Sequence, residues 1–406
     1  MTPFLQLLLF LSIILFLAKL GGLLSSSLRQ PSVLGELMVG LLLGPSLINI
    51  LHLPVFENIY IESIIASIAE IGVLLLMFVA GLELHLSELL RNSKVSAFAG
   101  ILGVLMPIGL GWGVGMLFGF QSSHALFLGL ALGATSVSIS AQTLMEMKAL
   151  RSRVGLGLLG AAVFDDILVI LLLSSFLALQ MGGSGIMDIG FIFLRMAAFL
   201  IFSVLFGLYV LPRLTRKISS LPISQGIVTL ALIIMFLYGF AAEMVGGMAA
   251  ITGSFLAGLM FARSPEKDRL ERGVNALSYS FFVPIFFVNI GLAVNVRELG
   301  TGTIWLLIAI VMVAIVGKLF GAGLGARLAG FSWIESAQLG AGMVSRGEVG
   351  LILASVGLNE GLMTANEFSA VVGMVILSTL ITPVLLRFLF SQETRAKASQ
   401  KISVRR

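Results

Sequence analysis

The sequence predicts an all-α polytopic membrane protein with 13 transmembrane helices, and three observations support this fold class. Of the 406 residues, 58% are hydrophobic and only 11% are charged, whereas soluble domains carry about 25% charged residues. The apolar residues form thirteen segments, each near the roughly 20 residues that a helix needs to cross a bilayer. The lysines and arginines gather in alternate loops between these segments, which is typical of a chain that crosses a membrane repeatedly.

The thirteen segments follow one another with short connections, so we expect one membrane domain over residues 1–390 and a short basic tail over 391–406. The least certain division separates the eighth and ninth segments, which are joined only by Gly246 and Gly247. The segments are Phe4–Leu24, Val33–Leu51, Ile64–Leu84, Val95–Phe120, Ala125–Met147, Val154–Leu179, Ile189–Leu211, Gly226–Val245, Met248–Ala262, Leu277–Val294, Thr303–Leu328, Trp333–Leu358 and Phe368–Phe390.

The basic residues predict the orientation of the chain. Twenty of the 25 lysines and arginines fall in the tail or in loops after odd-numbered segments. Arg297 falls after an even-numbered segment, and Lys19, Arg195, Lys318 and Arg346 lie within segments. Because basic loops favour the cytoplasmic side, we expect a multi-pass protein of the cell membrane with its N-terminus outside and its C-terminus in the cytoplasm. The net charge of +5 then follows from topology in the lipid bilayer, and no nucleic-acid partner is expected.

The composition also excludes several kinds of chemistry. The chain has no cysteine, which excludes disulfides and thiolate metal sites. Its three histidines (His52, His85 and His124) lie at or near the ends of apolar segments, so histidine-based catalysis has little to work with. The first segment lacks the basic start and small-residue cleavage site of a signal peptide. We expect no enzyme activity, no cofactor and no cleaved signal.

Two adjacent carboxylates, Asp165 and Asp166, lie midway along the sixth apolar segment. One ionised carboxylate at the bilayer centre costs on the order of 3 kcal/mol. Two neighbours also repel each other, so one of them should resist ionisation near neutral pH. The pattern indicates an ion or proton site that faces a bundle interior or a water-filled cavity. The alternative is a pair of structural acids that are satisfied by buried partners.

The fifth and twelfth segments read as helices that are interrupted halfway. Glycine and hydroxyl residues crowd the middle of Leu128–Gln142, and glycines with Arg346 and Glu348 crowd Leu339–Gly350. Unwound backbone at membrane depth is tolerated only where it is buried or lines water. The two segments are seven apart in order and so cross in opposite directions. This predicts inverted-topology repeats with two broken crossing helices, in which segments one to six correspond to eight to thirteen. Close helix packing is the simpler reading of the glycines.

Other polar residues inside the segments complete a candidate site. Thr135 and Ser136 carry hydroxyls that can coordinate a desolvated cation without adding charge. Lys318 lies about ten residues from the cytoplasmic end of its segment, too deep to reach the interface easily. It therefore needs a partner, for which an aspartate of the pair is the obvious candidate. Arg346 and Glu348 flank Gly347, and we expect them to neutralise each other or to brace the opposing half-helices.

Taken together and in order, these motifs resemble the monovalent cation:proton antiporter-2 family of the cation:proton antiporter superfamily. The resemblance runs over essentially all thirteen segments, and no single motif would carry it alone. The matching stretches are Gln30–Pro45, Phe78–Leu84, Gly133–Val137, Phe164–Asp166, Phe282–Val288, Gly317–Lys318 and Arg346–Gly350.

The resemblance implies a homodimer with two parts in each chain. A dimerisation part would span about residues 1–84 and 226–294, and a core transport part about 95–179 and 303–390. A linker helix would span about 189–211. It also implies an antiporter in which the core part moves against the dimerisation part around a site near the middle of the membrane.

The adjacent aspartates make the chain similar to the electrogenic sodium/proton antiporters of that family. Its glutathione-gated potassium efflux members usually have a glutamine–aspartate pair and a soluble nucleotide-binding domain, whereas this chain has Asp165 and no such domain. We therefore expect exchange of Na⁺ (or Li⁺) for H⁺. Asp166 would be the main Na⁺ ligand, with Asp165, Thr135, Ser136 and freed carbonyls beside it. Lys318 would pair with Asp165 when Na⁺ is absent.

Three other functions compete with this one. A K⁺/H⁺ antiporter of the same fold is the main alternative. An intramembrane aspartyl protease needs aspartates on two helices, commonly in Gly-x-Gly-Asp, and no such motif occurs here. A sodium-coupled symporter of organic solutes needs no proton-binding carboxylates, so the acidic pair argues against it.

Overall fold

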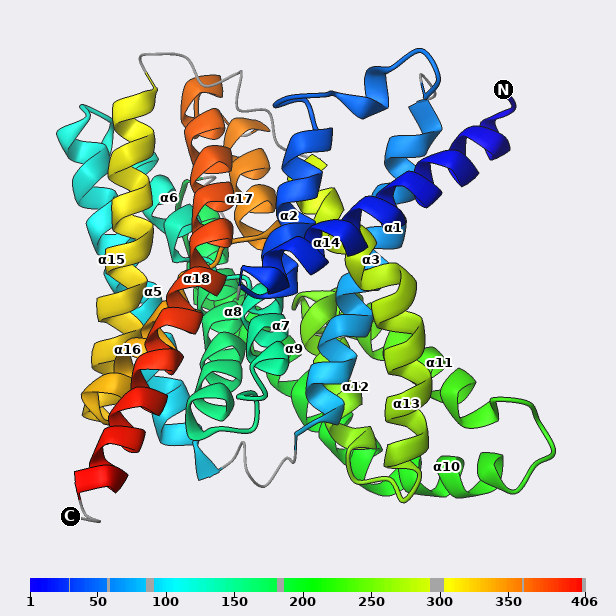
Figure 1. Cartoon of the computed structure of the whole chain (residues 1–406). Helices are drawn as coiled ribbons and strands as arrows, with labels where there is room; N and C mark the ends of the chain where they lie inside the picture. The colour runs from blue at the N-terminus through cyan, green and yellow to red at the C-terminus, as the bar shows by residue number, and fades with distance from the viewer. Residues whose placement is uncertain are drawn as a thin grey trace. The chain divides into compact units, whose positions relative to one another are not determined.

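The computed structural model describes residues 1–28, 30–56, 59–84, 91–180, 186–292, 303–359 and 361–403. Every regular element within these ranges is a helix (Figure 1). Arg29, His85, Arg297, Arg405 and Arg406, which entered the sequence analysis, lie outside the described residues. The α-helices are α1 (Pro3–Ser27), α2 (Ser32–Leu43), α3 (Ile59–Leu82), α5 (Ser93–Leu117), α6 (Ser122–Gly133), α7 (Val137–Glu146), α8 (Arg153–Gln180), α9 (Ile186–Leu205), α10 (Leu211–Ser219), α11 (Gly226–Ala241), α12 (Ala250–Phe261), α13 (Lys267–Leu277), α14 (Val283–Leu292), α15 (Ile304–Leu328), α16 (Trp333–Gly342), α17 (Glu348–Asn359) and α18 (Ala365–Ser403).

Ten helical spans among the described residues are long and apolar enough to cross a membrane, if α6 and α7 count as one span. Two shorter apolar helices, α2 and α12, have 12 residues each. The chain is thus a multi-pass membrane protein by the length and composition of its helices. The prediction of thirteen crossings depends on how the shorter helices are placed and is taken up below.

The helices form two compact units, which are described separately. Unit 1 comprises Met1–Leu20, Glu36–Arg91 and Asp166–Ala293. Unit 2 comprises Gly21–Gly35, Asn92–Asp165 and Val294–Arg406. The boundary falls within α8, between Asp165 and Asp166.

Unit 1 is built around α3, which packs against α12 and α14. The contact with α12 is close because glycines face each other's helix. A Cβ at Gly81 would lie 2.1 Å from the Phe255 carbonyl oxygen, and one at Gly258 would lie 2.0 Å from the Phe78 oxygen. The basic residue Arg195 of α9 is satisfied inside this unit, because its guanidinium donates hydrogen bonds of 2.8 Å to carbonyl oxygens at the end of η3 (Ala242–Gly246).

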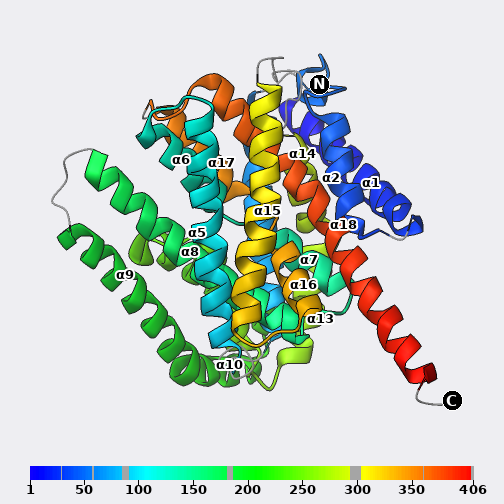
Figure 2. The same cartoon turned by 90° about the vertical axis from the view of Figure 1, so that its left-hand side faces the viewer.

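Unit 2 is built around α15, which packs along α5 and against α16 and α18. The two views agree that α5 and α15 run side by side (Figures 1 and 2). Glycines recur on one face of α15 at spacings of four residues, and their Cβ positions would collide with α5. At Gly321 a Cβ would lie 2.5 Å from the Leu102 oxygen, and at Gly325 it would lie 2.3 Å from the Phe98 oxygen. The two backbones are therefore in direct contact beside Lys318.

The division between the eighth and ninth predicted segments is present. The helix that begins with α11 ends at Gly246, and α12 begins at Ala250. Gly247 between them has φ +64°, a left-handed conformation that glycine adopts without steric cost.

Several helices extend beyond the apolar segments that predict them. The α18 helix continues to Ser403, well past the predicted limit at Phe390. α9 continues through η2 (Phe206–Val210) into the basic helix α10, which ends at Ser219. The charged linker after Ala262 forms α13, which runs through η4 (Ser278–Phe282) into α14. Apolar length marks the part of a helix that hydrocarbon can cover, and polar turns can continue the helix outside it.

Candidate functional site

Both predicted interruptions are present, and both lie in unit 2. The α6 helix ends at Gly133 and α7 begins at Val137, with Ala134 and Ser136 in extended conformations between them. The α16 helix ends at Gly342 and α17 begins at Glu348. A capping box fixes the start of α16, because the side chains of Ser332 and Glu335 bond reciprocally to each other's backbone N–H. Each break leaves backbone groups that need partners other than their own helix.

The two breaks supply these partners to each other. The Ser136 N–H donates to the Ser345 carbonyl at 3.0 Å, and the Ser345 hydroxyl donates to the Ser136 carbonyl. One turn into α7, the Ser140 hydroxyl donates to the Gly342 carbonyl at 2.5 Å. A Cβ at Gly347 would lie 2.6 Å from Ser136 Oγ, so only glycine fits at this position without movement. The extended strands of the two broken helices are thus bonded directly, side by side.

Arg346 binds the carboxyl ends of two half-helices at once. Its side chain is fully buried. Nη2 donates to the Leu132 carbonyl of α6 at 2.6 Å, and Nη1 donates to the carbonyls of Met343 and Val344 after α16 at 3.1 and 3.0 Å. A cation is stabilised there because the carboxyl end of a helix carries partial negative charge. These hydrogen bonds join the ends of the two half-helices through one side chain. The side chain of Glu348, at the start of α17, lies outside the described residues.

Asp165 and Lys318 form an ion pair in the interior of unit 2. Lys318 Nζ on α15 donates to Asp165 Oδ1 on α8. The lysine side chain is 0% exposed and the aspartate side chain 1%, so water does not screen their attraction. The negative charge of Asp165 also attracts the Arg346 guanidinium. The second carboxylate oxygen, Oδ2, is buried and has no hydrogen-bond partner among the described residues, which leaves acceptor capacity for a proton or a cation.

The hydroxyls of the first break differ in their surroundings. The Ser136 hydroxyl lies 2.9 Å from that of Ser138. The Thr135 hydroxyl is buried, and no hydrogen-bond partner for it is found in the part of the chain that the structure describes. Buried hydroxyls are normally hydrogen-bonded. An unsatisfied oxygen in a break of this kind is suited to coordinate a desolvated cation.

Asp166 belongs to unit 1 and is half-buried there. Thr252 of α12 donates its hydroxyl hydrogen to Asp166 Oδ2 at 2.8 Å, and the Thr252 side chain is buried. The sequence alone does not single out Thr252 as a site residue. The available signal was weak: a threonine beside a glycine and a serine, in an apolar segment that carries no charge. The hydrogen bond fixes the position of the Asp166 carboxylate against α12.

Asp165 thus has one carboxylate oxygen bound to Lys318 and a second one free of partners among the described residues, and Asp166 is held by a neutral donor. Within the described residues, no group of three or more histidine, cysteine, aspartate or glutamate residues could hold a metal ion. A resident metal centre built from such groups is not seen there, whereas a transient cation can use hydroxyl and carbonyl oxygens as well.

The amino-acid sequence is similar to those of known sodium/proton antiporters. The model of the family described as "Sodium/hydrogen exchanger, transmembrane" matches residues 12–392. The chain is 40% identical to the Na⁺/H⁺-K⁺ antiporter GerN of Bacillus cereus, over 96% of this chain and 98% of that protein. It is 35% identical to a Na⁺/H⁺ antiporter of Enterococcus hirae, over 93% of this chain and 96% of that protein.

A solved structure has a similar fold. The sodium proton antiporter MjNhaP1 of Methanocaldococcus jannaschii aligns with a TM-score of 0.67, over 95% of this chain and 97% of that chain. The sequence identity is 18%, so this likeness concerns the fold alone.

Proposed function

Because the chain belongs to the transmembrane sodium/hydrogen exchanger family, a family of transporters rather than enzymes, we propose that it exchanges Na⁺ (or Li⁺) for H⁺ across the cell membrane by alternating access. The observation that carries this proposal is the carboxylate pair of α8. Asp165 is buried against Lys318, and Asp166 accepts a hydrogen bond from Thr252.

We assign Asp166 as the main Na⁺ ligand, with Asp165, Thr135 and Ser136 as the other candidates and with carbonyl oxygens of the first break. Support comes from two buried oxygens of unit 2, Thr135 Oγ1 and Asp165 Oδ2, for which no hydrogen-bond partner is found among the described residues. Sodium prefers hard oxygen ligands of this kind. Arg346 braces the breaks, and Glu348 is proposed to support it.

The two fluxes are coupled by competition for the same carboxylates. Protons or Na⁺ neutralise the site and allow it to move, whereas the empty charged site resists movement across a low-dielectric barrier. In the Na⁺-free state the Lys318 ammonium group neutralises the Asp165 carboxylate. The lysine is released when Asp165 binds its next ligand. Two protons exchanged for one Na⁺ carry net charge, so the cycle is electrogenic.

The proposed architecture has thirteen crossings. Ten crossings are the ten long spans. The short apolar helices α2 and α12 supply two more, and the half-helices α16 and α17 together form the thirteenth. The N-terminus lies outside and the C-terminus in the cytoplasm, as the basic loops predict. We retain the dimerisation part (1–84 and 226–294), the core part (95–179 and 303–390), the linker helix (189–211) and a homodimer as proposals.

The test is exchange by the purified chain in liposomes. Asp166→Asn removes the negative charge of the proposed ligand, and we expect Na⁺-dependent proton movement to fall at least about a hundredfold, in line with the loss of a charged ligand worth roughly 3 kcal/mol. Glu62→Gln, which neutralises an exposed acid of α3, is the matched control and should exchange normally. Exchange near the wild-type rate in the Asp166→Asn protein would contradict the assignment.

Potassium is the second candidate ion, because the printed name of GerN includes K⁺. The same liposomes, assayed with Na⁺ and then with K⁺ at equal concentration, separate the two functions. Faster exchange with Na⁺ supports the proposal, and faster exchange with K⁺ replaces it by K⁺/H⁺ antiport.

A further inference from the structure

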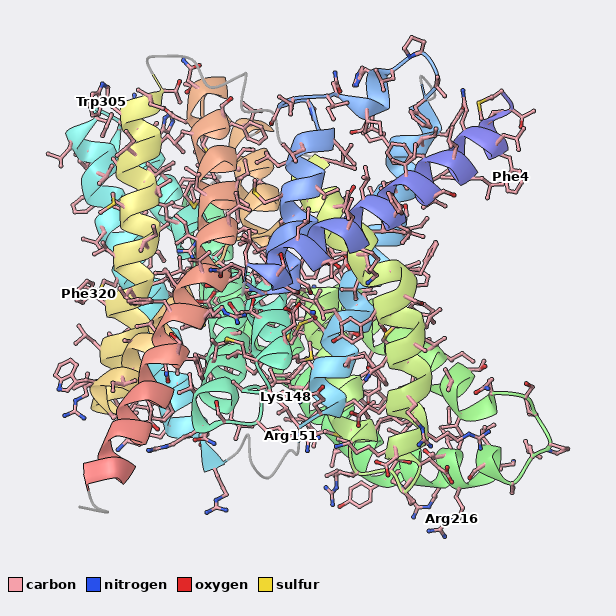
Figure 3. The ribbon with its side chains drawn as sticks, in the orientation of Figure 1. Phe4, Lys148, Arg151, Arg216, Trp305 and Phe320 are labelled. Atoms are coloured by element: carbon pink, nitrogen blue, oxygen red, sulfur yellow. The ribbon has the colours of Figure 1, made fainter. Side chains whose placement is uncertain are left out.

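An apolar cavity opens on unit 2 between α15, α16 and α18, and the proposed ion site does not use it. Its volume is about 290 Å³. Its rim carries large side chains that the protein leaves uncovered: Phe320 is 52% exposed, Trp333 67% and Phe388 58%. Phe320 points outward from α15 (Figure 3). In a membrane-spanning helix such side chains meet hydrocarbon, and an apolar cavity of this kind does not hold ordered water.

A cation stands beside this cavity. Arg327 lies three residues after Leu324 and seven after Phe320, so the three side chains share one face of α15. The stripe runs from the cavity to the charge over about 10 Å, at the helical rise of 1.5 Å per residue. Arg327 is exposed, and its guanidinium carbon lies 4.9 Å from the centre of the Trp333 ring. Nη1 also donates to the Phe331 carbonyl at 2.7 Å, which holds the guanidinium in place.

Other charges nearby leave a positive excess. Glu335 is the acid of this region, and its carboxylate accepts from the Ser332 N–H at 2.8 Å and lies 3.8 Å from Arg153. Arg153 itself stacks on the Phe331 ring at 4.6 Å. Among the described side chains, two guanidinium groups and one carboxylate therefore lie near the end of α15. Guanidinium groups bind phosphate in bidentate geometry.

One residue with a hydroxyl group lines the cavity between the cation and the apolar wall. Ser336 lines the cavity, its side chain is 3% exposed, and its hydroxyl has no hydrogen-bond partner among the described residues. Ser336 lies one helical turn after Trp333, hence deeper from the Arg327 end. A phospholipid presents groups in the same order along its length: a phosphate, then ester carbonyls that accept hydrogen bonds, then hydrocarbon.

We infer that the cavity between α15, α16 and α18 binds one acyl chain of an anionic phospholipid, whose phosphate lies against Arg327 and whose ester carbonyl accepts from Ser336. This is a binding site on the lipid-facing surface of unit 2. It needs no particular exchanged ion, so it stands or falls separately from the proposed function.

Quenching of tryptophan fluorescence by brominated lipid tests the inference at the site itself. The chain has three tryptophans, and replacing Trp112 and Trp305 by Phe leaves Trp333 as the reporter. The full-length protein is reconstituted with phosphatidylcholine, to which brominated phosphatidylglycerol or brominated phosphatidylcholine with the same chains is added. Circular dichroism checks that each variant is folded.

We expect brominated phosphatidylglycerol to quench Trp333 at a lower mole fraction than brominated phosphatidylcholine. Arg327→Gln should reduce this preference about tenfold, as for the loss of one charge-assisted hydrogen bond. Ala337→Phe, which fills the cavity, should reduce quenching by both lipids. If that variant does not fold, Ser336→Ala is used instead, and it should weaken quenching by both lipids because the ester carbonyl loses its donor. Arg216→Gln on α10 of unit 1 (Figure 3) is the control for general charge and should behave as wild type.

Three outcomes would overturn the inference. The first is equal quenching by the two lipids in the unmodified reporter protein. The second is an unchanged preference in Arg327→Gln. The third is protection of Trp333 that rises with protein concentration rather than with lipid, because a second copy of the chain would then cover the cavity.

Discussion

At the scale of single residues, Lys318 and Asp165 form an ion pair in an interior that excludes water. Removing one member of such a pair strands the other, and a stranded buried charge costs about 3–5 kcal/mol. Lys318 is therefore expected to stabilise the packing around Asp165, more than to carry the ion.

Lys318→Gln tests this role. We expect exchange to persist, because Asp166 is unchanged, but the free energy of unfolding should fall by about 3–5 kcal/mol, because the Asp165 carboxylate loses its ion-pair partner in a buried site. Lys318→Arg keeps the charge and should stay nearer the wild-type stability. The measurements are thermal unfolding and the initial rate of Na⁺-dependent proton movement in liposomes. Equal thermal stabilities for Lys318→Gln and wild type would show that the pair has no such role.

Thr252 is the second residue with a defined effect, because it donates to Asp166 at 2.8 Å. A hydrogen bond to a charged group contributes about 1.5–3 kcal/mol. In Thr252→Ala the carboxylate loses the donor that positions it, so it binds Na⁺ more weakly. We expect the Na⁺ concentration for half-maximal exchange at neutral pH to rise roughly tenfold. Thr252→Ser keeps the hydroxyl and should need little more Na⁺ than wild type. An equal Na⁺ requirement in all three proteins would rule out the donor.

The residues that can be found from the sequence and the one that cannot differ in the free energy needed to bury them. A charged side chain such as Asp165 or Lys318 is strongly disfavoured inside a membrane, so its presence in an apolar segment predicts that it has a partner. The structure pairs them with each other. Thr252 costs little in a helix, because a hydroxyl can bond to its own backbone. Nothing in the sequence therefore separates it from the many other hydroxyl residues of the chain.

At the scale of helices, the two breaks were predictable because glycine and serine gather in the middle of spans that otherwise read as continuous. What the sequence does not contain is their partner. The pairing of Ser136 with Ser345 joins residues 209 positions apart, and local pattern carries no information about such distances. The same holds for Arg346, whose four carbonyl partners come from two different breaks.

Gly347→Ala tests whether the contact between the breaks matters. The added Cβ would meet Ser136 Oγ at 2.6 Å and Ser136 Cβ at 2.7 Å, so the two extended strands must separate. We expect a loss of roughly 1–3 kcal/mol in stability, as for an overpacked core, and a loss of most exchange activity. Gly113→Ala on α5 is the matched control, since nothing lies within 4 Å of a Cβ there. Thermal unfolding and liposome exchange are the measurements, and equal behaviour of the two variants would contradict the expectation.

At the scale of the whole molecule, the family and its fold follow from the order of the motifs, whereas the lengths of the helices do not. Hydrophobicity predicts where a helix meets lipid, and it gives no limit for helices such as α18 that continue as polar turns. Stoichiometry is a property of the complete cycle and has no local pattern at all. It must be measured on the intact carrier.

We predict that a membrane potential drives the exchange. If two protons move against one Na⁺, one charge crosses in each cycle, and 100 mV contributes about 2.3 kcal/mol. A potential of that size, negative inside, should lower the Na⁺ concentration retained inside liposomes at equilibrium by roughly fiftyfold. Potassium diffusion potentials set with valinomycin provide the voltage, and liposomes without potential provide the baseline. Retained Na⁺ that does not depend on voltage would mean electroneutral exchange.

The glycine face of α15 has a mechanical consequence. Side chains between two helices can change rotamer and so absorb small displacements, but Gly321 and Gly325 bring α15 onto the backbone of α5 with no side chain between. Because the two backbones touch, α5 and α15 are expected to move together as one rigid unit. Lys318 lies on α15, one helical turn from this contact. Its ammonium group can move by rotation of its own side chain, while its Cα stays fixed relative to α5. A force on α5 would therefore reach the ion pair with little loss in between.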